Sequence, residues 1–98
     1  MELKKAFGRV LNRIRVIRGC TQEDFSIVSS RTYISTLERG IYSPTLEKLE
    51  DIASVLKVHP VTLLVACYAL RDDATLDEIF EKVKIDLDGG KLLAGLAE

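Results

Sequence analysis

The stretch TQEDFSIVSSRTYISTLERG, residues 21–40, decides how the rest of the chain is organised. A helix is expected to start here, because Thr21 is a natural N-cap and the acidic Glu23 and Asp24 follow in the first turn, where carboxylates meet the positive end of the helix dipole. Ser29-Ser30 should end this helix, since serine side chains compete for backbone hydrogen bonds and favour a turn or a new N-cap. The first helix is therefore expected to be short.

A second helix is expected to begin near Arg31 and to close at Gly40, because glycine accepts the left-handed conformation of a C-terminal cap. Its apolar positions fall on one face at helical spacing: Ile34, Leu37 and Ile41. The opposite face carries hydrogen-bond donors and short side chains: Arg31, Thr32, Ser35 and Thr36. Such a face suits close approach to DNA, since arginine grips guanine, and serine and threonine contact bases or phosphates. The alternative is a helix face that is merely solvated.

Length and composition indicate one globular domain. The chain has 98 residues, of which 47% are hydrophobic and 30% charged, which argues against disorder. Residues 1–5 lack a signal-peptide pattern, and the longest nearly apolar run, 60–70, is too short to span a bilayer. With no strand-like alternation, we expect an all-α, cytoplasmic protein without a membrane partner.

Charge is unevenly distributed along the chain. Residues 1–42 carry a net charge of +4 and residues 43–98 a net charge of −5, although the whole chain has only −1. A basic half and an acidic half are what a one-sided phosphate-binding surface requires. Arg9 and Arg13 lie one turn apart in a helix that is expected over residues 3–17. They either contact phosphate or form part of a solvated stripe.

Few residues in this sequence could bind a metal ion or take part in catalysis. Cys20 and Cys67 form no metal-ligand pattern, and the single His59 has no partner in sequence. We interpret Cys20 and Cys67 as small buried hydrophobes, with an exposed thiol at Cys20 as the alternative. There is no glycine-rich phosphate loop and no nucleophile with a plausible base, so we expect no enzyme activity, no metal and no cofactor.

Four further helices are expected from apolar periodicity and capping residues. They cover residues 3–17, residues from 44–46 to 56, residues 60–70 and residues 75–87. The expected caps of the last three are Ser43 or Thr45, His59 or its neighbour, and the capping box of Thr75 and Glu78. Arg15 borders the apolar stripe of the first of these helices, so it requires an acidic partner. The helix 60–70 is apolar nearly all round and must be covered on more than one side. Asp88-Gly89-Gly90 should end the last helix, before a loosely held tail.

The order of these motifs resembles the xenobiotic-response-element (Cro/repressor-like) helix-turn-helix family. A first helix ends in RG, TQE follows, the polar helix ends in TLERG, and SPTLEKLEDIASVLKVHPVTLL comes next. The resemblance covers about residues 4–68. It implies a five-helix domain that binds DNA as a dimer and regulates transcription, commonly by repression.

The resemblance also implies roles for individual residues. Gln22 falls where the family contacts phosphate, and Arg15 and Glu38 match an ion pair that joins the first helix to the recognition helix. Residues at the family's base-reading positions are Ser30, Arg31, Thr32 and Thr36. Expected contacts to the DNA backbone are made by Tyr33, Ser35, Tyr42 and Ser43.

Two features depart from the family pattern. Between Gln22 and Tyr33 the chain is two residues shorter than usual and lacks the customary turn glycine, so the helix expected after Thr21, which is the second helix of the family domain, or its turn must be trimmed. The stretch after Leu70 has no counterpart in the minimal family domain.

We therefore expect a DNA-binding domain over 1–70 and a helical extension over 71–98 that serves dimerisation. The helix 31–39 would enter the major groove of a palindromic operator as part of a homodimer, with no evident small-molecule ligand. The expected dimer interface consists of Leu63, Cys67, Leu70, Leu76, Ile79, Phe80 and Val83. The competing hypothesis is an antitoxin-like or adaptor module that binds another protein.

Overall fold

Helices account for the whole architecture of the described chain. The structure is a computed structural model that describes residues 1–89 and 91–97, and no strand occurs among them. The elements, in chain order, are α1 (Leu3–Ile17), the 3-10 helix η1 (Gln22–Phe25), α2 (Arg31–Glu38), α3 (Leu46–Leu56), α4 (Pro60–Asp72), α5 (Leu76–Gly89) and α6 (Leu92–Leu96). The expected all-α fold, with five helical elements followed by an additional one, is confirmed, and α6 was not anticipated.

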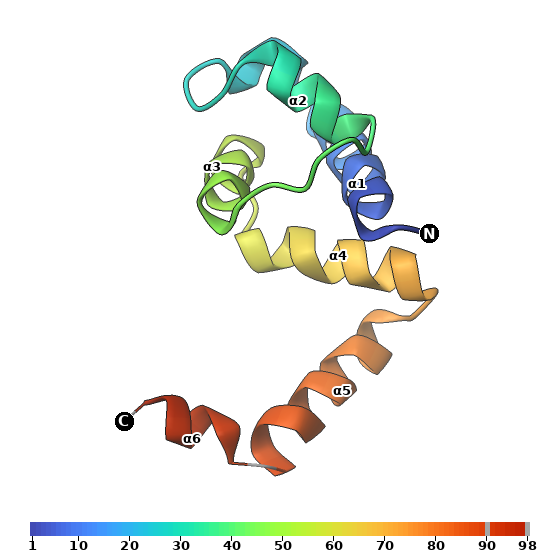
Figure 1. The fold of residues 1–98 in the computed structure, drawn as a ribbon, viewed down its shortest axis with the longest axis vertical. Coiled ribbons are helices and arrows are strands. Elements are labelled where there is room, and N and C mark those ends of the chain that lie inside the picture. Colours follow the sequence, from blue (N-terminus) through green and yellow to red (C-terminus); the bar gives the residue numbers. More distant parts are fainter. Residues whose placement is uncertain (90, 98) are drawn as a thin grey trace.

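The elements α1 to α4 pack around one core, and the two C-terminal helices project from it (Figure 1). α1 packs against both α2 and α4, and α3 also contacts α4. The largest fully buried side chains of the core come from η1 and from each of the helices α1 to α4. They are Phe25, Leu11, Ile34, Leu37, Ile52, Leu56, Leu63 and Cys67. α2 is thus held on a preformed scaffold.

Capping residues set the helix ends as the sequence indicates. Thr45 Oγ1 accepts a hydrogen bond from the backbone N–H of Lys48 at 3.1 Å, which selects Thr45 over Ser43 as the cap of α3. His59 caps α4 through Nδ1 ahead of Pro60 at the first helical position. Thr75 and Glu78 form the capping box that starts α5.

The helix expected to start after Thr21 is a single 3-10 turn, not an α-helix. Thr21 and Asp24 form a complete capping box at its start. Phe25 is fully buried, but the chain then turns at residues 26–29 instead of continuing as a helix. A single 3-10 turn and a turn at residues 26–29 thus fill the whole stretch between Thr21 and the Ser30 cap of α2.

Two isoleucines expected at apolar helical positions, Ile17 and Ile41, lie on the surface, and so does Ile27 in the turn after η1. Ile17 is 80% exposed, Ile27 93% and Ile41 40%. Ile17 and Ile41 stand at or beyond the ends of their helices, where the neighbouring element no longer covers the side chain. Leu46, expected on the apolar face of α3, is likewise 74% exposed, because the first turn of that helix extends past the core.

Gly8 allows α1 and α2 to approach each other closely. A Cβ built on Gly8 would lie 2.5 Å from the carbonyl oxygen of Leu37 and 2.6 Å from that of Glu38. Both contacts are to backbone, so neither can be relieved by a side-chain rotation. The absence of a side chain at Gly8 therefore allows the close spacing between α1 and α2.

Gly8→Ala is expected to lower the free energy of unfolding by about 1–3 kcal/mol, because the added methyl group overpacks the α1–α2 contact. This loss exceeds the gain in stability of about 1 kcal/mol that alanine normally gives over glycine inside a helix. Urea unfolding followed by circular dichroism measures it. Gly95→Ala is the matched control, since its Cβ would meet nothing within 4 Å. A Gly8→Ala protein as stable as the wild type would contradict this account.

The described residues contain no single helix long and apolar enough to cross a membrane. α3 and α4 taken together meet the length and composition requirement, but they are bent by 104° at the break between them.

Candidate nucleic-acid interface

α2 presents its polar side chains on the surface opposite the core. Ser30 caps the helix, and its Oγ accepts a hydrogen bond from the backbone N–H of Tyr33 at 3.0 Å. The core side of the helix buries Ile34 and Leu37 completely. Arg31 and Thr32, by contrast, are exposed at the first turn. The start of α2 is therefore the part most open to a partner.

Ser35 and Thr36 lie one turn further along α2 and are half-buried. The Thr36 hydroxyl donates to the carbonyl oxygen of Tyr33 at 2.7 Å, so its proton is already used within the helix. Its oxygen lone pairs and its methyl group remain for a ligand.

Tyr33 connects the recognition helix to α3. Its ring is half-buried and lies 5.9 Å from Lys48 Nζ, and burial raises the pKa of the phenol. Lys48 Nζ also donates a hydrogen bond to the carbonyl oxygen of Val28, in the loop before α2. Tyr33 and Lys48 thus fasten the loop and the helix to the scaffold.

The carboxylate of Glu38, at the end of α2, is the centre of a hydrogen-bond cluster. Arg15 Nε donates to Oε2 at 2.6 Å and its Nη2 donates to Oε1 at 3.0 Å. Asn12 and Gln22 donate to Oε1 at 2.9 and 3.3 Å. The Arg15 guanidinium also donates to the Cys20 carbonyl oxygen at 3.0 Å. This cluster joins α1, η1 and α2 at the recognition helix.

The cluster keeps Glu38 ionised although its side chain is only 7% exposed. Burial by itself raises the pKa of this carboxyl, but the hydrogen bonds from Arg15, Asn12 and Gln22 together outweigh it, and the net shift is downward. The hydrogen bond between Arg15 and Glu38 also raises the pKa of the Arg15 guanidinium. Within the described residues, no buried side-chain polar atom is left without a partner.

Gln22 is half-buried at the start of η1, where its amide donates to Glu38. This bond orients the side chain and leaves a second N–H and the amide oxygen free. Gln22 is therefore held in place by the same carboxylate that holds Arg15.

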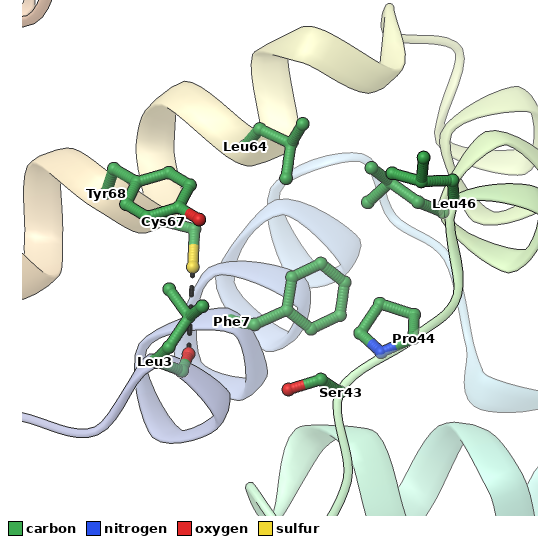
Figure 2. Close-up of a pocket in the computed structure, with 9 residues that line it drawn as sticks. Leu3, Phe7, Ser43, Pro44, Leu46, Leu64, Cys67 and Tyr68 are labelled. Carbon is green, nitrogen blue, oxygen red and sulfur yellow. Dashed lines mark hydrogen bonds between the residues drawn. The ribbon is translucent and has the colours of Figure 1, made fainter.

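Tyr42 and Ser43 lie in the loop after α2. Both are exposed, Tyr42 to 58%, and Ser43 also borders a cavity of about 190 Å³ between this loop, α1, α3 and α4. Figure 2 shows Phe7 and Pro44 beside Ser43 in this cavity, whose lining is mostly apolar. Its volume is below the range of about 300–1,000 Å³ that is usual for ligand sites.

The expected dimer interface is wrong for two of its residues. Leu63 is fully buried and Cys67 is 2% exposed within the single chain, because both pack into the core on the inner side of α4. Figure 2 shows the Cys67 thiol directed at the Leu3 carbonyl oxygen, with Sγ and O 3.7 Å apart. Neither residue can offer surface to a second copy.

The other five residues of the expected interface keep accessible surface along α4 and α5. Leu70 is 37% exposed, Leu76 55%, Phe80 46% and Val83 47%, and Ile79 is half-buried. An apolar hollow between α4 and α5 is lined by Val61, Thr62, Val65, Ala66, Leu76 and Phe80.

Two residues that hold the candidate site together, Asn12 and Lys48, were not predicted from the sequence. Asn12 lies three residues before Arg15 on α1, so helical spacing alone could have placed both side chains on one face. Lys48 offered no such indication, because its partners Tyr33 and Val28 are distant in sequence.

Comparison with known proteins agrees with this arrangement. A family model described as helix-turn-helix matches residues 11–63. The chain is 38% identical over 66 residues to an uncharacterized HTH-type transcriptional regulator, y4dJ, from Sinorhizobium fredii (strain NBRC 101917 / NGR234), and the match covers 65% of this chain and 86% of that protein. The crystal structure of the clp gene regulator ClgR from Corynebacterium glutamicum aligns with a TM-score of 0.66 at 24% identity, over 87% of this chain and 93% of that one.

The fold and the polar face of α2 thus define a helix-turn-helix protein of the kind that binds DNA. The chain belongs to the helix-turn-helix family, and the resemblance to xenobiotic-response-element regulators is confirmed. The likeness to ClgR supports the fold alone.

Proposed function

We propose that this protein is a transcriptional repressor that binds a palindromic operator as a homodimer and places the first turns of α2 in the major groove. The exposed polar start of α2 is the observation that carries the proposal. Arg31 and Thr32 are exposed there, on a helix whose other side is anchored by the fully buried Ile34 and Leu37. Occupancy of the operator would exclude other proteins from the same DNA. The proposal assigns no catalytic activity to the chain.

Base contacts and backbone contacts are assigned to different residues. Base edges are assigned to Ser30, Arg31, Thr32 and Thr36, and phosphate or sugar contacts to Gln22, Tyr33, Ser35, Tyr42 and Ser43. Tyr33 and Ser43 are the weaker members of the second group, since Tyr33 is half-buried against Lys48 and Ser43 borders the cavity. The exposed Arg9 and Arg13 of α1 extend the basic surface.

Dimerisation is assigned to the C-terminal extension, residues 71–98, and DNA binding to residues 1–70. One helix-turn-helix unit grips only a half-site, and two half-sites lie about 34 Å apart on one face of the duplex. The exposed apolar side chains of α4 and α5, Leu70, Leu76, Phe80 and Val83, offer the surface that holds two copies together.

Selection of bound duplexes from a random DNA library, using the full-length protein, tests the proposal. A palindromic consensus is expected, and affinity for it should fall steeply with salt because basic side chains displace counterions from phosphate. A protein that enriches no sequence and retards no duplex at low salt would not be an operator-binding regulator.

The alternative is an antitoxin-like or adaptor module, and the exposed apolar residues of α5 and α6 are what favours it. Leu92, Leu93 and Leu96 are 53%, 59% and 75% exposed, so α6 offers apolar surface to a protein partner. The absence of DNA binding in the selection, together with a monomeric chain in solution, is the result that this alternative predicts.

Arg31→Ala is expected to weaken binding to the selected operator by about 1–3 kcal/mol and to relax base preference at one position in each half-site. The reason is that an exposed arginine at the start of the recognition helix suits bidentate binding to guanine. Repeating the selection with the variant measures both effects, and Arg18→Ala, on the exposed end of α1, serves as the control. Equal weakening on every sequence would make Arg31 a phosphate contact.

A further inference from the structure

An acidic side chain lies within the basic rim of the proposed DNA surface. A shallow hollow beside the start of α2 is lined by Arg15, Thr21, Gln22, Glu23 and Arg31. Arg31 Nη1 lies 3.2 Å from Glu23 Oε1, and the two side chains are 68% and 71% exposed. The ion pair therefore joins η1 to α2 across the mouth of the hollow.

Apart from Glu23, the lining of this hollow consists of hydrogen-bond donors and two cations. Neighbouring carboxylates do not line the hollow: Glu38 is paired with Arg15 and accepts from Asn12 and Gln22, and the exposed Asp24 accepts from the Thr21 backbone N–H at 2.7 Å. Glu23 is thus the one lining residue that repels an approaching phosphate.

The pair also relieves an unfavourable placement of Arg31. A cation at the first residue of a helix faces the positive end of the helix dipole. Glu23 balances this charge in the free protein, and a DNA phosphate or the electronegative edge of guanine would balance it in the complex. Glu23 and DNA therefore compete for the same guanidinium.

We propose that Glu23 is a built-in competitor of DNA for Arg31, which holds operator affinity below the value that the basic surface alone would give. The proposal rests on the DNA-binding function inferred above. An exposed pair is weak enough for DNA to displace, so Glu23 limits affinity without preventing binding. It also lowers the salt dependence of binding, because the repulsion between Glu23 and the DNA phosphates is strongest at low salt and is screened as the salt concentration rises.

Glu23→Gln in the full-length protein tests this inference. Affinity for the selected operator should rise on the order of fivefold at low salt, the range expected for removal of an exposed ion pair and its repulsion. The slope of log affinity against log salt should steepen by roughly 0.5–1. Fluorescence anisotropy with a labelled duplex at several salt concentrations measures both quantities, and thermal melting checks that the fold is unchanged.

Two matched variants separate competition for Arg31 from a general charge effect. Glu81→Gln removes the same charge from the exposed surface of α5 and should leave affinity within twofold. In an Arg31→Ala background, Glu23→Gln should lose most of its effect, because no guanidinium remains to be released.

Each outcome decides a different point. If neither wild type nor Glu23→Gln binds any duplex, the proposed function and this inference both fail. If wild type binds and Glu23→Gln binds no more tightly, the inference alone is overturned. An equal gain from Glu81→Gln, or an undiminished gain in the Arg31→Ala background, would also overturn it.

Discussion

Glu38→Ala is expected to lower the free energy of unfolding by about 3 kcal/mol, the lower end of the cost of leaving one partner of a buried ion pair alone, because this pair is partly buried. The side chains of Arg15 and Glu38 are 15% and 7% exposed, so water can solvate the Arg15 guanidinium only in part once the carboxylate is lost. Asn12 and Gln22 would lose the same acceptor. Chemical unfolding at neutral pH measures the change.

A double variant provides the matched control. Arg15→Met combined with Glu38→Leu removes both charges and should recover most of the stability, since apolar residues of similar size often replace a buried pair without loss. A Glu38→Ala protein that unfolds at the wild-type denaturant concentration would contradict the assignment of the pair as a structural element.

Acid should reproduce part of the Glu38→Ala effect. Because the pKa of Glu38 is lowered in the folded protein, its contribution is fully present above the unfolded-state pKa of about 4.3 and is lost as pH falls through the folded-state pKa. Stability measured from pH 6 down to pH 3 should therefore fall more steeply in wild type than in Glu38→Gln.

Removal of the chain after Arg71 is expected to convert a dimer into a monomer and to weaken operator binding by about 10²–10⁴-fold, because the second half-site is no longer bound in an intramolecular step. The buried core ends at Cys67, so the shortened protein keeps the interior of α1 to α4. Light scattering gives the oligomeric state, and anisotropy with a palindromic duplex gives the affinity.

Phe80→Asp in the full-length protein tests the same surface without truncation. Phe80 is 46% exposed and lines the hollow between α4 and α5, so a carboxylate there should disfavour association. Glu81→Ala, one residue along and exposed, is the control and should remain dimeric. A shortened protein that stays dimeric would place the interface elsewhere.

Local patterns predicted most of the fold, because caps and periodicity act within a few residues. The bounds of α1, 3–17, match the apolar spacing, and the caps Thr45, His59 and Thr75 occupy their expected places. The exposed ends of helices could not be predicted in this way. Periodicity identifies an apolar face, but it does not say where the neighbouring element stops.

The residues of the candidate surface also differ in how far local sequence patterns could place them. Arg31 and Thr32 could be placed on the open side of α2 from spacing alone, whereas the pairing of Arg15 with Glu38 came only from the family resemblance. The ties from Lys48 to Val28 and from Arg31 to Glu23 were not foreseen. They depend on how two elements are positioned in space, which the sequence of either element does not contain.

The single-turn η1 has a consequence for how this protein can change over evolution. After Phe25 the chain reaches Ser30 through residues 26–29, where Val28 packs against the core and accepts a hydrogen bond from Lys48, whereas Ile27 is 93% exposed and the core places little demand on it. The entropy of closing a loop grows slowly with its length, and insertions there would cost little stability. The Ser30 cap and the contact of Lys48 with the Tyr33 ring involve no residue of 26–29 and would still hold the start of α2. A change in the length of this loop next to Ile27 would therefore alter the angle at which α2 meets DNA in the proposed complex, while the scaffold stays intact.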